Sequence, residues 1–372
     1  MTKPTSIERD PLYVVAPPIV TDKTKRFGHI IVWGTFTLMF LLAIIQFLNT
    51  NEHITFGFKT WRPVLYAYIL WACAIGYSRV LIYGEKGKRT LFVFPAVMFI
   101  LSIVIFPMLF GLYISFTDWN LSSIDGREFN GLDNFYQMIS DPYYWNALKN
   151  MIYYVLAVLV EFAIAFLLAL LLNSQIRGRK FFRIAFLIPL MLSPVAVSWM
   201  VGKSMLEQRF GPVANLGRFL GWETPTFFSS PEIARLTMMC MDAWTFIPLM
   251  IIMLLAGLQA LPKEVLEAAK VDGANKWTMF KNIIFPIMLP VSLTTLVIRI
   301  IFKLKLADII IIVTAGGPGG ATDSVTSFIV REYRDRSNVG YGTLLSFVYL
   351  ILIIIFMTIL IRFVNRWLQG AA

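Results

Sequence analysis

The sequence has few of the side chains from which most enzyme sites are built. Its 372 residues include only two cysteines and two histidines. Two cysteines, Cys73 and Cys240, cannot form a disulfide framework or a cysteine-based metal site, and two histidines cannot form a histidine cluster. Charged residues make up only 15% of the chain, whereas about 25% is usual in soluble proteins. These shortages argue against a metal site and against a soluble globular protein.

Long apolar segments are what the sequence has instead. Hydrophobic residues make up 58% of the chain, and the mean hydropathy is +0.70. A helix that crosses a bilayer needs about 20 mostly apolar residues, and eight segments are long enough. We therefore predict an all-α, polytopic membrane protein with eight transmembrane helices. Their approximate limits are 28–48, 61–83, 91–117, 147–172, 183–206, 236–258, 286–313 and 343–366.

Lysine and arginine predict the orientation of these spans, because cytoplasmic loops carry more of them than outside loops do. With the N-terminus in the cytoplasm, the cytoplasmic segments hold the larger share, including the clusters at 86–89 and 177–183. We therefore predict a protein of the inner (plasma) membrane with both termini in the cytoplasm. The net charge of +11 is then explained by topology and by contact with the lipid membrane, and no nucleic acid partner is expected.

The loops suggest a division of the chain into two parts. Residues 1–90 contain a polar, proline-bearing cytoplasmic tail and two spans, and they end in a basic turn. Residues 91–372 contain six spans, and their outside loops are too short to fold as separate domains. We expect 1–90 to be an addition to a six-span core.

The cytoplasmic loop between the sixth and seventh spans has the pattern of two short helices. Pro262 can begin a helix and Gly273 can supply the left-handed residue that ends it, so residues 262–272 are predicted to be helical. A second helix is predicted from the helical spacing of Trp277, Phe280 and Ile284. Such a pair suits insertion into a groove of a partner protein. A connector that lies on the membrane surface explains the same spacing equally well.

This loop, residues 259–285, resembles a known motif. The residues that carry the resemblance are, in order, Glu267, Ala268, Ala269, Asp272, Gly273, Ile283, Phe285 and Pro286. Their order and spacing are similar to the EAA loop of permease subunits of binding-protein-dependent ATP-binding-cassette importers. Phe285 departs from the family pattern, which has leucine there, and it keeps an apolar side chain. Further matches to the carbohydrate-uptake class lie in order across 91–366, among them Ala256-Gly257-Leu258-Gln259 and Thr314-Ala315-Gly316-Gly317-Pro318.

The resemblance implies a type I ABC importer permease that translocates a sugar or sugar-like solute. In this family a permease pairs with a second permease and two cytoplasmic ATPases, and an extracytoplasmic binding protein delivers the solute. The chain has no G-x-x-x-x-G-K-[ST] phosphate loop, so ATP is expected to bind to separate ATPase subunits, and the permease itself is expected to be neither an enzyme nor a cofactor-binding protein. Carried over by position, Glu267 contacts the ATPase, while Ala268 and Ala269 allow close approach. Gly273, next to Asp272, sets the bend.

Charged residues inside the predicted spans indicate candidates for the solute pathway. Arg299 lies near the midplane of the seventh span, Lys303 lies one turn further out on the same face, and Asp308 follows in the outer part. Glu161 lies near the middle of the fourth span and is expected to be the only acid within a span that can pair with Arg299. An unpaired charge in a span is costly, so each must pair, face water or bind solute. For Arg299 the alternatives are a structural pair, a place in the cavity lining, and snorkelling.

The solute class and the rival functions depend on these same charges. If Arg299 and Lys303 face the cavity, an anionic solute is expected, such as a sulfonated, phosphorylated or uronic sugar; a neutral sugar is the default. An ion-coupled secondary transporter or channel that uses Glu161 and Arg299 would explain the spans, but it leaves the loop 259–285 without a role. A membrane enzyme needs a cluster of His, Cys, Asp or Glu at one depth, and the sequence shows none.

Overall fold

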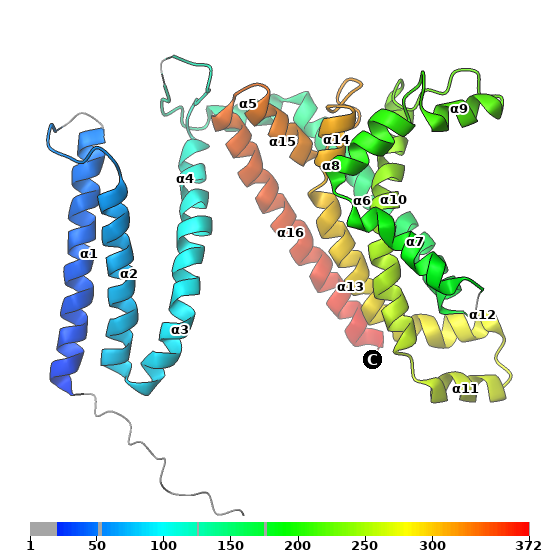
Figure 1. Ribbon diagram of the computed structural model, residues 1–372, viewed down its shortest axis with the longest axis horizontal. Helices are drawn as coiled ribbons and strands as arrows, with labels where there is room; N and C mark the ends of the chain where they lie inside the picture. Colours follow the sequence, from blue (N-terminus) through cyan, green and yellow to red (C-terminus); the bar gives the residue numbers. More distant parts are fainter. Residues whose placement is uncertain (1–20, 51–53, 125, 175–176, 372) are drawn as a thin grey trace, which may run out of the picture. The chain divides into compact units, whose positions relative to one another are not determined.

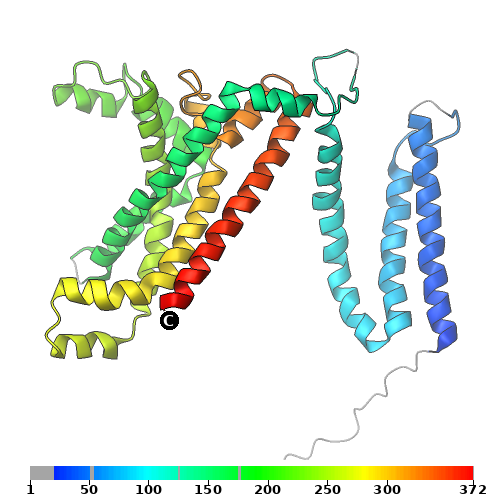
Figure 2. The ribbon, with the colours of Figure 1, turned by 180° about the vertical axis from the view of Figure 1, so that it is seen from behind.

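The computed structural model describes residues 21–50, 54–124, 126–174 and 177–371, and most of them are helical (Figure 1, Figure 2). Within these ranges, β-pairing is limited to two isolated bridges. The all-α prediction is therefore confirmed. Residues 1–20 of the predicted cytoplasmic tail lie outside the described residues. The chain divides into two compact units, Met1–Phe110 and Gly111–Ala372.

The first unit holds the helices of the predicted N-terminal addition and most of the predicted third span. They are α1 (Asp22–Thr50), α2 (Arg62–Tyr83), α3 (Glu85–Ile100), the π-helical turn η2 (Leu101–Ile105) and the first part of α4 (Phe106–Ile114). Polar contacts join the first two helices, where the Ser78 hydroxyl donates to the Gly28 carbonyl at 2.9 Å. The unit ends within the predicted span 91–117 and beyond residue 90, so the division into 1–90 and 91–372 stays a prediction.

The second unit is built on long helices that run between its two ends, with short helices at each end (Figure 1). The long helices are α6 (Pro142–Asn173), α10 (Pro231–Gln259), α13 (Phe285–Leu304) and α16 (Val339–Ala371). The segments at one end are α11 (Lys263–Val271), α12 (Lys276–Met279) and the π-helical turn η4 (Phe280–Ile284). Those at the other end are α5 (Asp133–Ser140), α9 (Pro212–Phe219), α14 (Asp308–Val313) and α15 (Val325–Arg334).

One predicted span, 183–206, is sharply bent. Helix α7 (Arg179–Met191) is followed by α8 (Pro194–Val197) and the π-helical segment η3 (Ser198–Met205), and the two parts meet at 98°. Ser193 caps the second part, because its hydroxyl accepts from the backbone N–H of Ala196 at 3.1 Å. Proline at the first helical position cannot donate a backbone hydrogen bond, so Pro194 favours a new helix start at this break.

Six helices among the described residues are long and apolar enough to cross a membrane, and the bent pair makes a seventh candidate. The six are Asp22–Thr50, Arg62–Tyr83, Gly87–Ile114, Pro142–Asn173, Pro231–Gln259 and Val339–Arg366. The remaining predicted span, 286–313, is divided into α13 and α14. The backbone tightens at the end of α13, where Lys305 N–H bonds to Phe302 C=O and Leu306 N–H to Lys303 C=O. The count of eight spans therefore stays a prediction.

Two apolar clusters hold the second unit together. One joins α6, α10, α13, α14, α15 and α16 and includes the buried side chains of Tyr154, Ile310 and Phe328. The other joins α6, α10 and α13 near the end that carries α11, and includes Phe166 and Leu254. Since α6, α10 and α13 contribute to both clusters, these three helices form the centre of the unit.

Candidate functional site

The coupling loop, residues 259–285, folds as the two predicted short helices with a bend between them. Pro262 is the residue before α11 and Lys263 is its first residue, so the helix begins one residue later than predicted. Gly273 has φ +78°, which is the left-handed conformation that glycine adopts without strain. The Ala274 N–H bonds to the Ala269 carbonyl at 2.9 Å, as in a Schellman helix end.

The second helix of the coupling loop has its own start signal. The Asn275 side chain accepts from the backbone N–H of Thr278 at 2.8 Å and so caps α12. Helix α12 then continues through η4 into α13, and Pro286 lies at the start of α13. Figure 1 and Figure 2 show that α11 and α12 lie across the end of the second unit, whereas α13 rises from it.

The exposed face of the coupling loop carries both polar and apolar side chains. Glu267 and Asp272 are exposed, and Val271 and Trp277 are 88% and 69% exposed. Ala269, by contrast, is buried. Exposed large apolar side chains beside a carboxylate are typical of a surface that binds a protein partner.

The base of the coupling loop is anchored on α6 by aromatic rings. Phe166 is buried, and its ring centroid lies 5.7 Å from that of Phe280 and 6.1 Å from that of Phe285. Phe285 is the residue that departs from the family pattern, and it makes the apolar contact expected of it. The loop is thereby attached to the centre of the second unit.

Four charged side chains meet in the interior of the second unit, and we call them the charge quartet: Glu161, Asp242, Arg299 and Lys303. Arg299 Nε lies 2.7 Å from Glu161 Oε2, and Lys303 Nζ lies 2.8 Å from Glu161 Oε1. Asp242 Oδ2 pairs with both Arg299 and Lys303. The four residues are 0–3% exposed. The predicted Glu161–Arg299 pair is thus present, within a larger set.

Asp242 is the member that the sequence prediction misses, because that prediction names Glu161 as the only acid able to pair with Arg299. The signal was available, since Asp242 lies inside the predicted sixth span 236–258 and an acid there requires a partner. Asp308, which was predicted to accompany Arg299 and Lys303, is exposed at the start of α14 and has no ion pair within the described ranges. The pathway role predicted for these residues stays a prediction.

Aromatic rings surround the two cations of the quartet. The Arg299 guanidinium lies 4.6 Å from the ring centroid of Phe246, and Lys303 Nζ lies 6.0 Å from that of Tyr154. Ring faces attract cations, most strongly where water is excluded. Among the described residues, Arg299 Nη1 has no hydrogen-bond partner, so one buried donor of the quartet is unsatisfied.

A polar stripe on α6 continues from the quartet to the loop that joins α14 and α15. The Tyr154 hydroxyl donates to the Thr322 carbonyl at 2.7 Å, and the Asn150 amide donates to the carbonyls of Gly320 and Asp323 at 3.0 and 2.9 Å. Asp323 also pairs with Arg331. Burial raises the pKa of Asp323 to about 6, against the opposing influence of Arg331.

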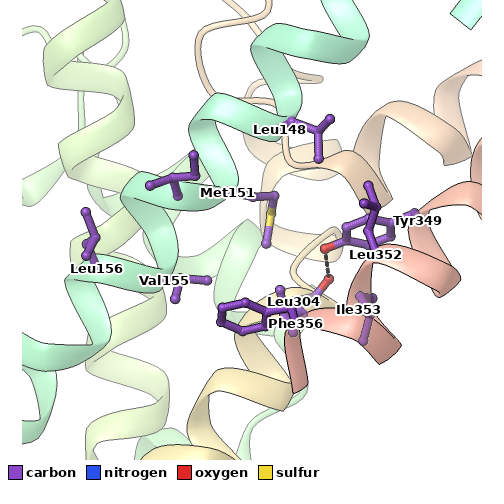
Figure 3. Close-up of a pocket in the computed structure, with 10 residues that line it drawn as sticks. Leu148, Met151, Val155, Leu156, Leu304, Tyr349, Leu352, Ile353 and Phe356 are labelled. Carbon is purple, nitrogen blue, oxygen red and sulfur yellow. Dashed lines mark hydrogen bonds between the residues drawn. The ribbon is translucent and has the colours of Figure 1, made fainter. Parts of the chain in front are cut away.

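The pocket in Figure 3 lies among α6, α13 and α16 and has a volume of about 290 Å³. Its lining is apolar except for Tyr349, whose hydroxyl donates to the Leu304 carbonyl at 2.8 Å. A sugar needs several free hydrogen-bonding groups, because buried hydroxyls without partners are costly. This pocket is therefore not a candidate sugar site.

A comparison with known families decides what kind of protein this is. The family described as "binding-protein-dependent transport system inner membrane component" matches residues 11–370. The chain belongs to this family. The permease is 30% identical over 281 residues to the trehalose/maltose transport system permease protein MalF of Thermococcus litoralis, and the match covers 75% of this chain and 94% of that protein.

Further relatives agree with this assignment. The permease is 30% identical over 273 residues to the sulfoquinovosyl glycerol transport system permease protein SmoG of Agrobacterium fabrum, which covers 73% of this chain and 88% of that protein. A solved structure of a bacterial alginate ABC transporter, in complex with its alginate pentasaccharide-bound periplasmic protein, shares the fold. Its TM-score is 0.65 at 22% identity, over 84% of this chain and 99% of that chain.

Family membership confirms the main prediction from the sequence. The chain is a multi-pass permease of a binding-protein-dependent importer with the type I permease fold, and its relatives are permease subunits rather than enzymes. An ion-coupled secondary transporter that uses Glu161 and Arg299 is not favoured, because membership of this family already explains the coupling loop.

Proposed function

We propose that this permease is the membrane subunit of an ATP-driven importer for a sugar or sugar-like solute. Relatives named for trehalose/maltose and for sulfoquinovosyl glycerol support a carbohydrate solute. A neutral sugar is the proposed solute, because the two cations that were expected to attract an anion, Arg299 and Lys303, are each paired with carboxylates of the same chain.

The observation that carries this proposal is the geometry of the coupling loop. An exposed carboxylate, Glu267, and two exposed apolar side chains, Val271 and Trp277, are presented by helices that turn at Gly273. The permease has no phosphate-binding loop of its own, so the energy of ATP must reach it through contact with another chain. A short helix that enters a groove is a common mode of such contact.

We also propose the partner subunits of this permease and its orientation in the membrane. Two cytoplasmic ATPases would bind the coupling loops of this permease and of a second permease, and an extracytoplasmic binding protein would deliver the solute at the opposite end. The distribution of lysine and arginine supports a place in the inner membrane with the coupling loop and both termini in the cytoplasm.

Affinity purification of the tagged permease from its native membrane tests this proposal. We expect a Walker-type ATPase and a second permease to co-purify, and we expect the ATPase to be lost in Glu267→Lys. Glu232→Lys is the matched control, because Glu232 is also an exposed glutamate of a helix but lies in the first turn of α10, at the end of that helix away from the coupling loop. Recovery of the permease alone, or only as a homo-oligomer, would contradict the proposal.

A further inference from the structure

The charge quartet is electrically balanced within the chain. It contains two carboxylates and two cations, so its net charge is zero. Both oxygens of Glu161 are used, one by Arg299 and the other by Lys303, and Asp242 pairs with the same two cations. Arg299 and Lys303 are 0% exposed. No charge in this set is left to attract an ionic solute.

The quartet also joins three helices that are far apart in the sequence. Glu161 belongs to α6, Asp242 to α10, and both cations to α13. Each cation of α13 pairs with a carboxylate on each of the other two helices. Separating any one of the helices would therefore break at least two ion pairs and leave unpaired charges at membrane depth, which is costly.

An incoming anion would meet the same obstacle. Apart from the buried Arg299 Nη1, which has no hydrogen-bond partner among the described residues, the donors that pair these cations are already in use. An anion that took them would have to displace Glu161 or Asp242, and the displaced carboxylate would then be buried without a partner. Removing one partner of a buried pair is strongly destabilising, whereas replacing both partners by apolar groups is often tolerated. The rings of Phe246 and Tyr154 further occupy the space next to the cations.

We propose that Glu161, Asp242, Arg299 and Lys303 form an electrostatic clasp that keeps α6, α10 and α13 together throughout the transport cycle. The clasp is not a receptor for an anionic solute. The role of the clasp in keeping the three helices together does not depend on the proposed function. The conclusion that it does not bind an anionic solute rests on that function. Movement that opens the pathway then occurs around this three-helix group and not within it.

A double-mutant cycle tests the clasp, with the full-length permease purified in lipid nanodiscs together with whatever subunits co-purify. The single variants are Asp242→Asn and Lys303→Met, and the double variant combines them and leaves the Glu161–Arg299 pair intact. The control cycle uses Asp308→Asn and Lys305→Met, which change the same residue types at exposed positions nearby. The readouts are the Tm of each protein and the KM for solute uptake after reconstitution.

Each single variant should lower the Tm by about 10 °C, because it leaves an uncompensated buried charge. The double variant should recover at least half of that loss, and it should take up solute with a KM within about twofold of the original. The control cycle should shift the Tm by less than about 2 °C.

Two results would overturn the clasp. One is a double variant whose Tm is no higher than that of the less stable single variant, which would show that the charges do not compensate one another. The other is a set of single variants with unchanged Tm and a KM raised tenfold or more, which would show that the charges contact the solute. The Tm cycle needs no transport, so failure of the proposed function would not be confused with failure of the clasp.

Discussion

The bend at Gly273 offers a direct way to separate ATP hydrolysis from transport. Gly273 has φ +78°, and a Cβ added there would meet no atom within 4 Å. A Cβ at this position therefore clashes with no other part of the chain, and the effect expected within the chain comes from the backbone. A left-handed conformation costs an ordinary residue roughly 1–2 kcal/mol, and a β-branched residue is the least suited to it. Gly273→Val should thus disfavour the bent loop by at least this amount.

The expected size of the functional effect follows from that free energy. A penalty of 1–2 kcal/mol lowers the population of the bent loop about 5- to 30-fold relative to other conformations, and coupling falls in proportion to the competent fraction. Gly273→Asn is the matched control, because asparagine tolerates the left-handed region. In proteoliposomes that contain the whole importer, solute uptake per ATP hydrolysed should fall in Gly273→Val and stay near the original value in Gly273→Asn.

The reasoning would be refuted if both variants lowered the ratio equally, because side-chain size and not backbone conformation would then be the cause. It would also be refuted if Gly273→Val transported as well as the original protein. Total ATPase activity serves as the internal check that the complex has assembled.

Two further predictions concern the base of the coupling loop and the loop that joins α14 and α15. Phe166→Ala removes the aromatic contacts with Phe280 and Phe285 and a third with Phe162, of about 0.5–1.5 kcal/mol each, and it opens a cavity, so it should lower the Tm and the uptake per ATP. Phe363→Ala, at an exposed position of α16, should change neither, and equal effects of the two variants would contradict the anchoring role. Asp323 has a pKa raised from 3.8 to about 6, so its contribution to stability is present at low pH and is lost as the pH rises through 6. Asp323→Asn should therefore raise the free energy of unfolding at pH 7.5 by up to about 3 kcal/mol. It should also reduce the change of the Tm with pH between pH 5 and 7. A lower Tm in Asp323→Asn would show instead that the pair with Arg331 outweighs the burial of the carboxylate.

Local signals explain which parts of the coupling loop could be predicted from the sequence. Pro262 and Gly273 restrict the backbone at their own positions, so they mark a helix start and a helix end without knowledge of the rest of the fold. The structure places α11 between them, within one residue at each end. The contact of Phe166 with Phe280 and Phe285 could not be predicted in this way, since it joins residues that are over a hundred positions apart.

Hydropathy was a good guide to the existence of spans and a poor guide to their ends. The apolar segment 286–313 reads as one span, but the helix ends at Leu304 and a separate short helix begins at Asp308. Hydropathy reports which residues avoid water, and α14 is buried as well because Ile309 and Ile310 lie in the core. A buried short helix and the end of a span therefore give the same signal.

Charges within the predicted spans also allow only part of the structure to be predicted. An acid or a base in a span predicts that a partner exists, and this rule found the pair of Glu161 and Arg299. It does not say how many partners there are or on which helix, because that depends on how the helices face one another. Asp242 was missed for this reason, and a list of all acids within the predicted spans would have included it.

The coupling loop and the clasp act on the same three helices at different depths. Phe166 of α6 holds the base of the loop within a cluster that also includes residues of α10 and α13, and the clasp joins the same helices further from that loop. Closely packed elements transmit displacement because their contacts resist compression. A force applied to α11 by a partner would therefore move α6, α10 and α13 together. The bend of 98° between α7 and α8 lies outside this group, so that segment is where relative motion within the second unit is expected.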